Sequence, residues 1–215
     1  MPKLQDVTIS EAELIEYLET SSDFAFELRC LQRLNDIGFR CRHGGSYTDP
    51  VTKKTRQFDM RAEKAHEKLS VQCAIECKNL TESFPLLVMC VPRTKDESFH
   101  ELIMSYHPDL VKQSYPRASA FDTNCKSIRV QHPHSIYSAG ALVGKSCVQV
   151  GKTLNGDICG NDAEVFEKWS QALASADDLA DIASKKGEKQ NNFHLAAVLP
   201  LLVVPNGKLW TVNYD

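Results

Sequence analysis

The sequence has no long hydrophobic run. Its apolar stretches stay below the roughly 18 residues that a membrane-spanning helix needs. The first residues, M-P-K-L-Q-D, lack the basic and then apolar pattern of a secretory signal. We therefore expect a cytoplasmic protein without a membrane partner. With 42% hydrophobic and 25% charged residues among 215, the chain has the composition of a soluble globular protein, and we expect one domain over 1–215.

The sequence also lacks the cysteine spacing of a disulfide framework or of a usual zinc site. The eight cysteines are scattered along the chain, and none forms a C-x-x-C. Several lie within apolar runs, where a reduced cysteine acts as a small hydrophobe. A zinc site built from His132 and His134 with some of Cys125, Cys147 and Cys159 remains an alternative, although its spacing matches no usual pattern.

A strong net charge is absent as well. The formal value of −3 argues against a protein that coats nucleic acid indiscriminately. The charges are unevenly distributed, because residues 1–28 hold one lysine and seven acids, net −6, whereas residues 29–68 hold ten basic and five acidic residues, net +5. A basic stretch therefore precedes the most informative motif of the chain.

The hydrophobic pattern predicts a mixed α/β domain. A helix is expected from Ser21 or Ser22 to the stop at Gly38, followed by three short strands over 39–43, 55–61 and 69–78, whose short connections imply antiparallel pairing. A fourth, buried strand is expected over 84–92, with a helix behind it over 97–105. This order of elements favours a three-layer fold with a mixed central sheet flanked by helices.

The C-terminal third of the chain carries the most regular helical pattern. A helix is expected over 161–186, with Val165, Phe166, Trp169, Leu173, Ala176, Leu179 and Ile182 on its inner side. Apolar runs on both sides of a P-N-G turn predict a hairpin, so the helix and hairpin over 161–215 are expected to pack on the same sheet. Trp169 and Trp210 are expected in the core because both lie within apolar runs.

Residues 74–80, A-I-E-C-K-N-L, place two charges in an otherwise apolar strand. Alternation puts Glu76 and Lys78 on one face and Cys77 on the other. If the preceding strand pairs with this one, the Asp59 carboxylate faces Glu76. Glu27 projects from the apolar stripe of the first long helix and can join them. Three carboxylates and a lysine are therefore expected to converge.

Carboxylates packed together in a partly dry place need a shared cation or proton. Oxygen ligands of this kind suit Mg²⁺ or Mn²⁺. The arrangement resembles the PD-(D/E)XK nuclease superfamily, the restriction-endonuclease-like fold. In that resemblance Asp59 is the first acidic residue and Glu76-Cys77-Lys78 is the (D/E)-x-K element, while Glu27 is the acidic residue of the leading helix. The core motif region spans 21–95, and Phe58 stands where the family often has a proline.

The resemblance implies a metal-dependent nuclease that hydrolyses phosphodiester bonds, with DNA favoured over RNA. Asp59, Glu76 and the backbone carbonyl of Cys77 would hold Mg²⁺, with Glu27 acting through a metal-bound water. Lys78 would orient the attacking water or stabilise the charge that grows on the phosphate. The setting would be defence against foreign DNA or repair, by analogy of fold alone. A homodimer would suit double-strand cleavage.

Three further residues are candidates for substrate contact. Arg61 lies on the same strand face as Asp59. Lys145 and Gln149 fall in a segment over 139–154 that is expected to be a helix beside the active site, from which they could reach the scissile phosphate. The V-G-K-S at 143–146 lacks the first glycine of a phosphate-binding loop at the required spacing. The main rival to the nuclease is a non-catalytic nucleic-acid-binding or scaffold module with the same fold.

Overall fold

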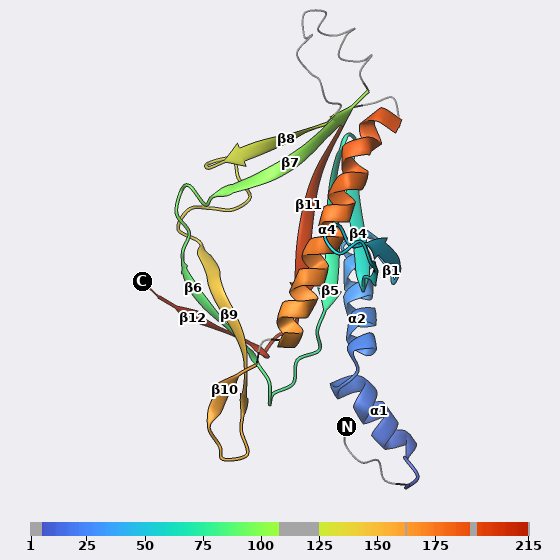
Figure 1. Cartoon of the computed structure of the whole chain (residues 1–215), viewed down its shortest axis with the longest axis vertical. Coiled ribbons are helices and arrows are strands. Elements are labelled where there is room, and N and C mark those ends of the chain that lie inside the picture. The colour runs from blue at the N-terminus through green and yellow to red at the C-terminus, as the bar shows by residue number, and fades with distance from the viewer. Residues whose placement is uncertain (1–5, 108–124, 162, 190–192, 215) are drawn as a thin grey trace, which may run out of the picture.

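A computed structural model describes residues 6–107, 125–161, 163–189 and 193–214. These residues form a mixed α/β fold with two principal sheets and a long helix beside the larger one (Figure 1). No helix among them is long and apolar enough to cross a membrane. The architecture confirms the α/β class and the mixed sheet, while its division into two sheets was not predicted.

The larger sheet has six strands in the order β1-β4-β5-β11-β7-β8. Their bounds are β1 Arg40–His43, β4 Met60–His66, β5 Leu69–Cys77, β7 Phe99–Tyr106, β8 Cys125–Gln131 and β11 Phe193–Val203. The first three form an antiparallel meander, as predicted, but the predicted middle strand over 55–61 overlaps β4 only at Met60 and Arg61. β11 pairs with β5 in parallel, which makes the sheet mixed. β5 lies inside this sheet and is buried along most of its length, as its continuous apolar run predicts.

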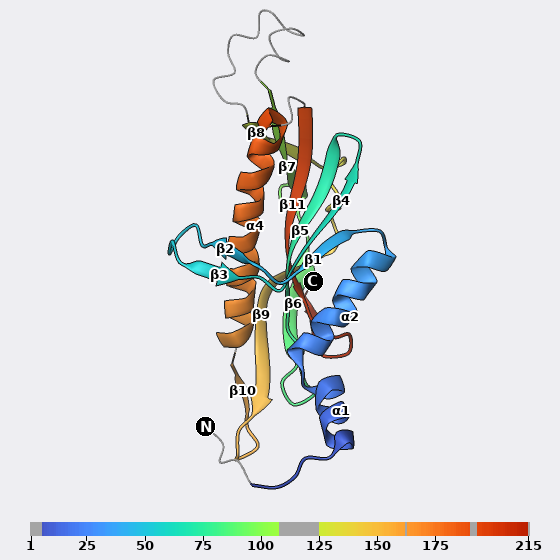
Figure 2. The ribbon, with the colours of Figure 1, turned by 90° about the vertical axis from the view of Figure 1, so that its right-hand side faces the viewer.

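Helices cover both faces of the meander (Figure 2). α2, Asp23–Asp36, begins at the N-cap Ser22 and packs through Phe26 against Ile75 and Cys77. On the other face Ala74 packs against α4, Ala163–Lys189. The predicted alternation along β5 is therefore confirmed, because Ile75 and Cys77 face α2 whereas Ala74 faces α4. α1, Glu11–Thr20, begins with a capping box at Ser10 and buries none of its residues.

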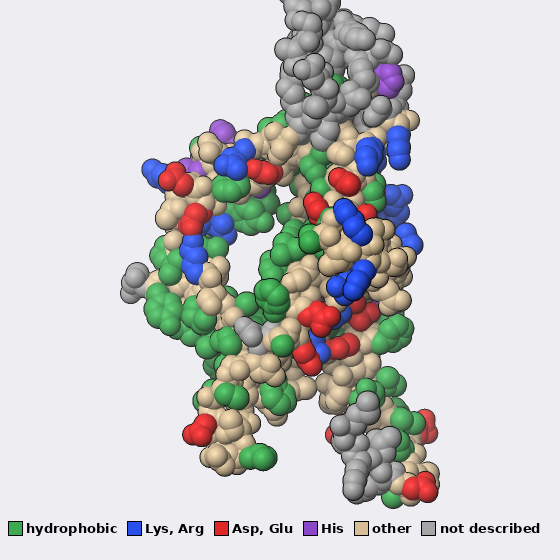
Figure 3. All heavy atoms as spheres, viewed as in Figure 1, with side chains coloured by type: hydrophobic (Ala, Val, Ile, Leu, Met, Phe, Trp, Pro, Cys, Tyr) green, Lys and Arg blue, Asp and Glu red, His purple; other side chains and the backbone are tan. Residues whose placement is uncertain are grey.

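The smaller sheet has the order β10-β9-β6-β12. Its strands are β6 Leu86–Pro92, β9 Leu142–Lys152, β10 Ile158–Gly160 and β12 Leu209–Asn213. It meets the rest of the fold at a seam in which Leu80 and Leu86 pack against Val165 of α4. Figure 3 shows an opening between this sheet and the layer of α4 and β11, bordered by hydrophobic side chains. A short hairpin of β2, Ser46–Thr48, and β3, Thr55–Gln57, lies beside α4.

Two predicted helices are strands. Residues 97–105 fall largely in β7, which pairs with β11 on one side and β8 on the other. The segment 139–154 contains β9, which pairs with β6 and β10. Gly144 explains part of this difference, since a Cβ there would lie 2.7 Å from Val88, and glycine disfavours a helix interior. Both errors come from short apolar runs that fit either period.

The predicted C-terminal hairpin does not form. β11 belongs to the larger sheet, and the turn at Pro205 and Gly207 carries the chain into the smaller sheet. There β12 pairs with β6 in parallel, with Trp210 opposite Leu87. The turn itself was predicted correctly, but its two flanking strands have different partners, which only contacts between distant segments can determine.

Candidate functional site

Asp59 lies where the chain changes its pairing partner. The predicted strand 55–61 is broken here, because β3 pairs with β2 while β4 pairs with β1 and β5. Phe58 is buried, and its N–H donates to the carbonyl of Gly45, while the Asp59 carbonyl accepts from the N–H of Gly44. These hydrogen bonds anchor the break on both sides of the chain and hold Asp59 directly before the first residue of β4.

The Asp59 and Glu76 side chains meet across the two strands. Met60 pairs with Ile75, so the next position in the register sets Asp59 against Glu76. The N–H of Cys77 donates to Asp59 Oδ2 at 2.8 Å, and the N–H of Asp59 donates to Glu76 Oε1 at 3.3 Å. Each carboxylate therefore accepts a hydrogen bond from the backbone of the opposite strand. The predicted convergence of these two acids is present.

Lys168, on α4, lies between the two carboxylates. Its Nζ is 2.6 Å from Asp59 Oδ2 and 3.1 Å from Glu76 Oε2. The Glu76 side chain is only 1% exposed, whereas those of Asp59 and Lys168 are 16% and 23% exposed. The two carboxylates thus share one ammonium at the edge of the core. The shared cation that the sequence argument required is supplied here by a lysine.

Burial and crowding shift the proton affinities of this cluster. Burial, and then the charge of Asp59, raise the pKa of Glu76 to about 7. Burial alone would lower the pKa of Lys168, but the hydrogen bond to Asp59 and the charge of Glu76 raise it to about 12. Lys168 therefore remains charged at neutral pH, while Glu76 gains and loses its proton there.

Lys78 is near the site but has other partners. β5 ends at Cys77, and Lys78 Nζ lies 3.3 Å from Asp23 Oδ2 and 3.1 Å from Glu164 Oε2. Both acids belong to the first turns of their helices. Glu164 precedes Lys168 by one helical turn on the same face of α4. Lys78 therefore links α2 to α4 through Asp23 and Glu164. Its ion pairs are with these two acids and not with Asp59 or Glu76.

Glu27 does not join the other two carboxylates. As predicted, it lies beside the buried face of α2, but its Oε2 is 2.9 Å from Nε2 of His43 on β1. The His43 ring in turn meets Phe24 edge to face, with centroids 5.5 Å apart. Among the described residues, no three His, Cys, Asp or Glu side chains gather as they do around a metal ion. The predicted cluster of three carboxylates is therefore reduced to two.

The Cys77 thiol turns away from the site, as predicted. Its side chain belongs to the buried cluster that packs under α2. The hydrogen bond with Cys30, and then burial, raise the pKa of this thiol. The thiol is thus a core group, and only the backbone of Cys77 borders the two carboxylates.

Arg61 lies on the site face of β4 but is held by protein groups. Its guanidinium donates to Asp178 Oδ2 at 2.8 Å and to the Ser175 hydroxyl at 3.1 Å, both on α4. It also stacks on the Phe58 ring, with Cζ 4.4 Å from the centroid. Arg61 therefore joins β4 to α4 just beyond the carboxylates.

The sequence predicts that Lys145 and Gln149 lie on a helix beside the active site. The structure does not contain this helix. Both lie on β9 in the smaller sheet. Lys145 pairs with Glu97, and Gln149 donates to the carbonyl of Phe84 at 3.1 Å. Their partners lie in the turn that leads to β7 and in the bend that precedes β6. The predicted helix from which they were to reach the scissile phosphate is therefore wrong.

Lys168 was missed by the sequence argument, although the pattern contains its signal. It follows Val165 by three residues and precedes Ala172 by four, and both are buried. A lysine at that spacing lies on the buried side of the helix, by the same reasoning that selected Glu27 on α2. A buried lysine requires an anionic partner, and Asp59 and Glu76 are the two that it reaches.

Comparison of this chain with protein-family models, with curated proteins and with solved structures gives no match.

The raised pKa of Glu76 predicts a pH-dependent stability in metal-free buffer. Glu76 keeps its proton in the fold up to about pH 7 but loses it near 4.5 when unfolded. As the pH rises from 4.5 to 7, the free energy of unfolding of wild type should therefore fall by about 3 kcal/mol. The fall is measured relative to Glu76→Gln, whose side chain cannot ionise. Urea denaturation of both proteins across this range measures the difference. Parallel pH profiles would contradict it.

Proposed function

We propose that this protein is a metal-dependent nuclease that hydrolyses phosphodiester bonds, with DNA favoured over RNA. The observation that carries the proposal is the approach of the Asp59 and Glu76 carboxylates to one cation, on adjacent strands at the edge of the core. Placing a buried carboxylate beside a second one costs free energy, and such arrangements cluster at functional sites. A divalent ion that binds both carboxylates and a phosphate would offset this cost.

The order of elements supports the restriction-endonuclease-like core. α2 is followed by the antiparallel meander β1-β4-β5, then after an insertion by the crossover helix α4 and the parallel strand β11 next to β5. α2 and α4 lie on opposite faces of the meander. The positions of Asp59, directly before β4, and of Glu76, near the end of β5, support the assignment of both to the motif. The smaller sheet is an addition to this core.

The donor set fits a divalent metal ion if Lys168 moves aside. Asp59 and Glu76 supply carboxylate oxygens, and Mg²⁺ commonly takes one or two carboxylates and completes its shell with water and phosphate. The Lys168 side chain is long and flexible, so rotation about its outer bonds can move the ammonium away from the two carboxylates without moving α4. When bound, the ion would polarise the phosphate and lower the pKa of an attacking water.

The chain's own groups have separate roles in this proposal. Asp59 and Glu76 would bind the ion, held by the N–H groups of Cys77 and Asp59. The Lys168 ammonium, once displaced from the carboxylates, would face the scissile phosphate and stabilise its developing charge. Lys78 would position α4 through Glu164 and so fix the reach of Lys168. Glu27 would act only through His43, which it orients.

A catalytically inactive nucleic-acid-binding module with the same fold is the second candidate. The position of Lys168 favours it, because a lysine between two carboxylates satisfies them without a metal. The two candidates differ in one respect that can be measured, namely whether the carboxylates accept a divalent ion in place of the ammonium.

The test is a nuclease assay on linear, circular and single-stranded DNA with Mg²⁺, Mn²⁺ or EDTA. We expect cleavage with either metal and none with EDTA. Lys168→Met should lower the cleavage rate by about 10²-fold because it removes a charge next to the phosphate. Lys78→Met should have a smaller effect, since Lys78 pairs with acids of the helices. Metal-independent cleavage, or none on any substrate, would contradict the proposal.

A further inference from the structure

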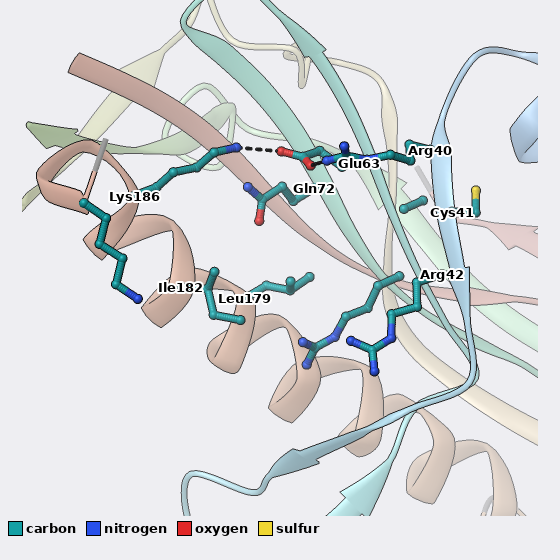
Figure 4. A pocket seen from close by; sticks show the side chains of 11 residues that line it. Arg40, Cys41, Arg42, Glu63, Gln72, Leu179, Ile182 and Lys186 are labelled. Carbon is teal, nitrogen blue, oxygen red and sulfur yellow. Dashed lines mark hydrogen bonds and ion pairs between the residues drawn. The ribbon is translucent and has the colours of Figure 1, made fainter. Parts of the chain in front are cut away.

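A groove lies between α4 and the strands β1 and β4. Its volume is about 540 Å³, and residues of β1, β4, β5 and α4 line it. Figure 4 shows Arg42 extending from β1 toward the helix, while Lys186 of α4 reaches Glu63 of β4 across the groove. The floor is partly apolar, formed by Leu179 and Ile182. The groove is thus an open channel between a helix and the edge of the larger sheet.

Positive charge dominates the lining. Five cations, Arg40, Arg42, Arg61, Lys186 and Lys189, face one lining carboxylate, Glu63. This excess occurs in a chain whose formal net charge is −3. The two lysines alone could be explained by the helix dipole, because they lie in the last turn of α4. The three arginines are on strands, where no dipole accounts for them.

The protein's own acids neutralise only part of this charge. Glu63 pairs with Arg40 at 2.5 Å and with Lys186 at 2.8 Å, and Asp178 pairs with Arg61. Arg42 and Lys189 have no carboxylate partner among the residues that the structure describes. Arg42 is instead held over the Phe58 ring, 5.6 Å from its centroid. Two cations in one groove are therefore available to an anionic ligand.

The groove approaches the carboxylate pair. Arg61, which lines it, follows Asp59 by two residues on β4, a separation of about 7 Å along a strand. On α4 the groove lysine Lys186 lies 18 residues after Lys168, or about 27 Å along the helix. The lining cations therefore extend from beside the candidate site to the far end of α4. A ligand with phosphates along its length suits such a row better than one compact anion.

We propose that this groove binds the phosphodiester backbone of a nucleic-acid strand and leads it toward Asp59 and Glu76. Arginine and lysine bind phosphates without regard to sequence, so the groove would supply affinity and direction rather than sequence specificity. The destination of the strand rests on the proposed nuclease function, whereas the binding itself does not.

Binding is measured by the fluorescence anisotropy of labelled single-stranded and duplex DNA, in EDTA and between about 50 and 200 mM salt. The variant Arg42→Gln/Lys189→Gln removes the two unpaired cations. The matched control Arg33→Gln/Lys152→Gln removes the same charge from the opposite face, on α2, and from the smaller sheet, where both residues are exposed. The groove variant should bind about tenfold more weakly than wild type.

The salt dependence identifies how the groove holds the strand. Removing one cation that binds a phosphate should reduce the slope of log K against log salt by about 0.7 for a single strand and about 0.9 for a duplex. Equal weakening of binding in the groove variant and the control would overturn the proposal. So would inhibition of DNA binding by pyrophosphate at equal phosphate concentration, because it would indicate a site for a small anion.

The two proposals fail separately. If wild type binds DNA through the groove but no metal supports cleavage, the nuclease function is wrong and the groove stands. If wild type cleaves DNA and the groove variant binds and cleaves as the control does, the groove is wrong and the nuclease stands.

Discussion

Asp59→Asn and Glu76→Gln should each lower the rate of Mg²⁺-dependent DNA cleavage by about 10³-fold or more. Each change preserves the shape of the side chain while removing a charged oxygen ligand. Because Asp59 and Glu76 are the only two carboxylates that meet at Lys168 among the described residues, neither can be replaced by a neighbour. A metal ion at such a site contributes several kcal/mol to transition-state stabilisation. Initial rates under single-turnover conditions measure the effect.

Two exposed carboxylates provide matched controls for this prediction. Asp157→Asn lies in the turn between β9 and β10, and Glu101→Gln lies on β7, where it removes an exposed pair with Arg129. Both should cleave at the wild-type rate. Glu76→Gln should also be at least as stable as wild type at pH 7, since burial penalises the ionised Glu76. Reduced activity in that variant could then not be attributed to unfolding. Wild-type cleavage by either site variant would contradict the assignment.

Lys168→Met should lower the free energy of unfolding by about 3–5 kcal/mol at pH 8 in EDTA. The methionine keeps most of the apolar side chain but leaves Asp59 and the buried Glu76 without their shared cation. Removing one partner of a buried ion pair has a cost of this order, because the remaining charge is uncompensated. The destabilisation should shrink at pH 5, where Glu76 can take up a proton. Urea denaturation at both pH values measures it.

Two comparisons isolate the cause of this destabilisation. Lys185→Met is an exposed substitution on the same helix and should change stability by less than about 0.5 kcal/mol. Adding Glu76→Gln to Lys168→Met should recover about 1–3 kcal/mol, the coupling expected of residues in direct contact. Saturating Mg²⁺ should also stabilise Lys168→Met more than wild type, because the ion no longer competes with the ammonium. Additive effects in the double variant would show that Lys168 acts elsewhere.

The part of the site that could be predicted is formed by strands that are consecutive in the sequence. Glu76 and Asp59 were found because β4 and β5 are consecutive, and strand alternation together with a short turn fixes which side chains face each other. The same alternation correctly placed Cys77 in the core. Glu27 lies beside the buried face of α2, as predicted, but its partner His43 belongs to another element, β1, whose position against α2 depends on tertiary packing.

The predicted buried stripe of α4 was right at Val165, Ala176 and Leu179, which are buried, and wrong at its larger side chains. The predicted stripe included Phe166, Trp169 and Ile182, which are 68%, 40% and 52% exposed. The buried residues that the prediction left out include Ala172 and Ala183, whose small side chains let the helix approach the sheet closely. Because the prediction favoured large apolar residues, it did not identify the alanine-rich face of α4 that carries Lys168. Trp210 was likewise expected in the core and is 63% exposed on β12.

The second sheet could not be predicted from any single segment. β6 was recognised as a strand, but its partners are β9 and β12, which lie roughly 50 and 120 residues later in the chain. Pairings at such distances depend on the whole fold rather than on local propensity. The predicted helix over 139–154 placed Lys145 and Gln149 beside the active site, but this segment forms β9, so the helix from which they were to reach the phosphate does not exist.

The central claim is that Asp59 and Glu76 together bind a divalent metal ion in place of Lys168. Its most direct test is calorimetric titration of the metal-free protein with Mn²⁺, comparing wild type with Asp59→Asn, Glu76→Gln and the control Glu101→Gln. The account predicts one saturable site in wild type and control, absent from both site variants, and tighter in Lys168→Met. Equal Mn²⁺ binding by wild type and the two site variants would contradict it.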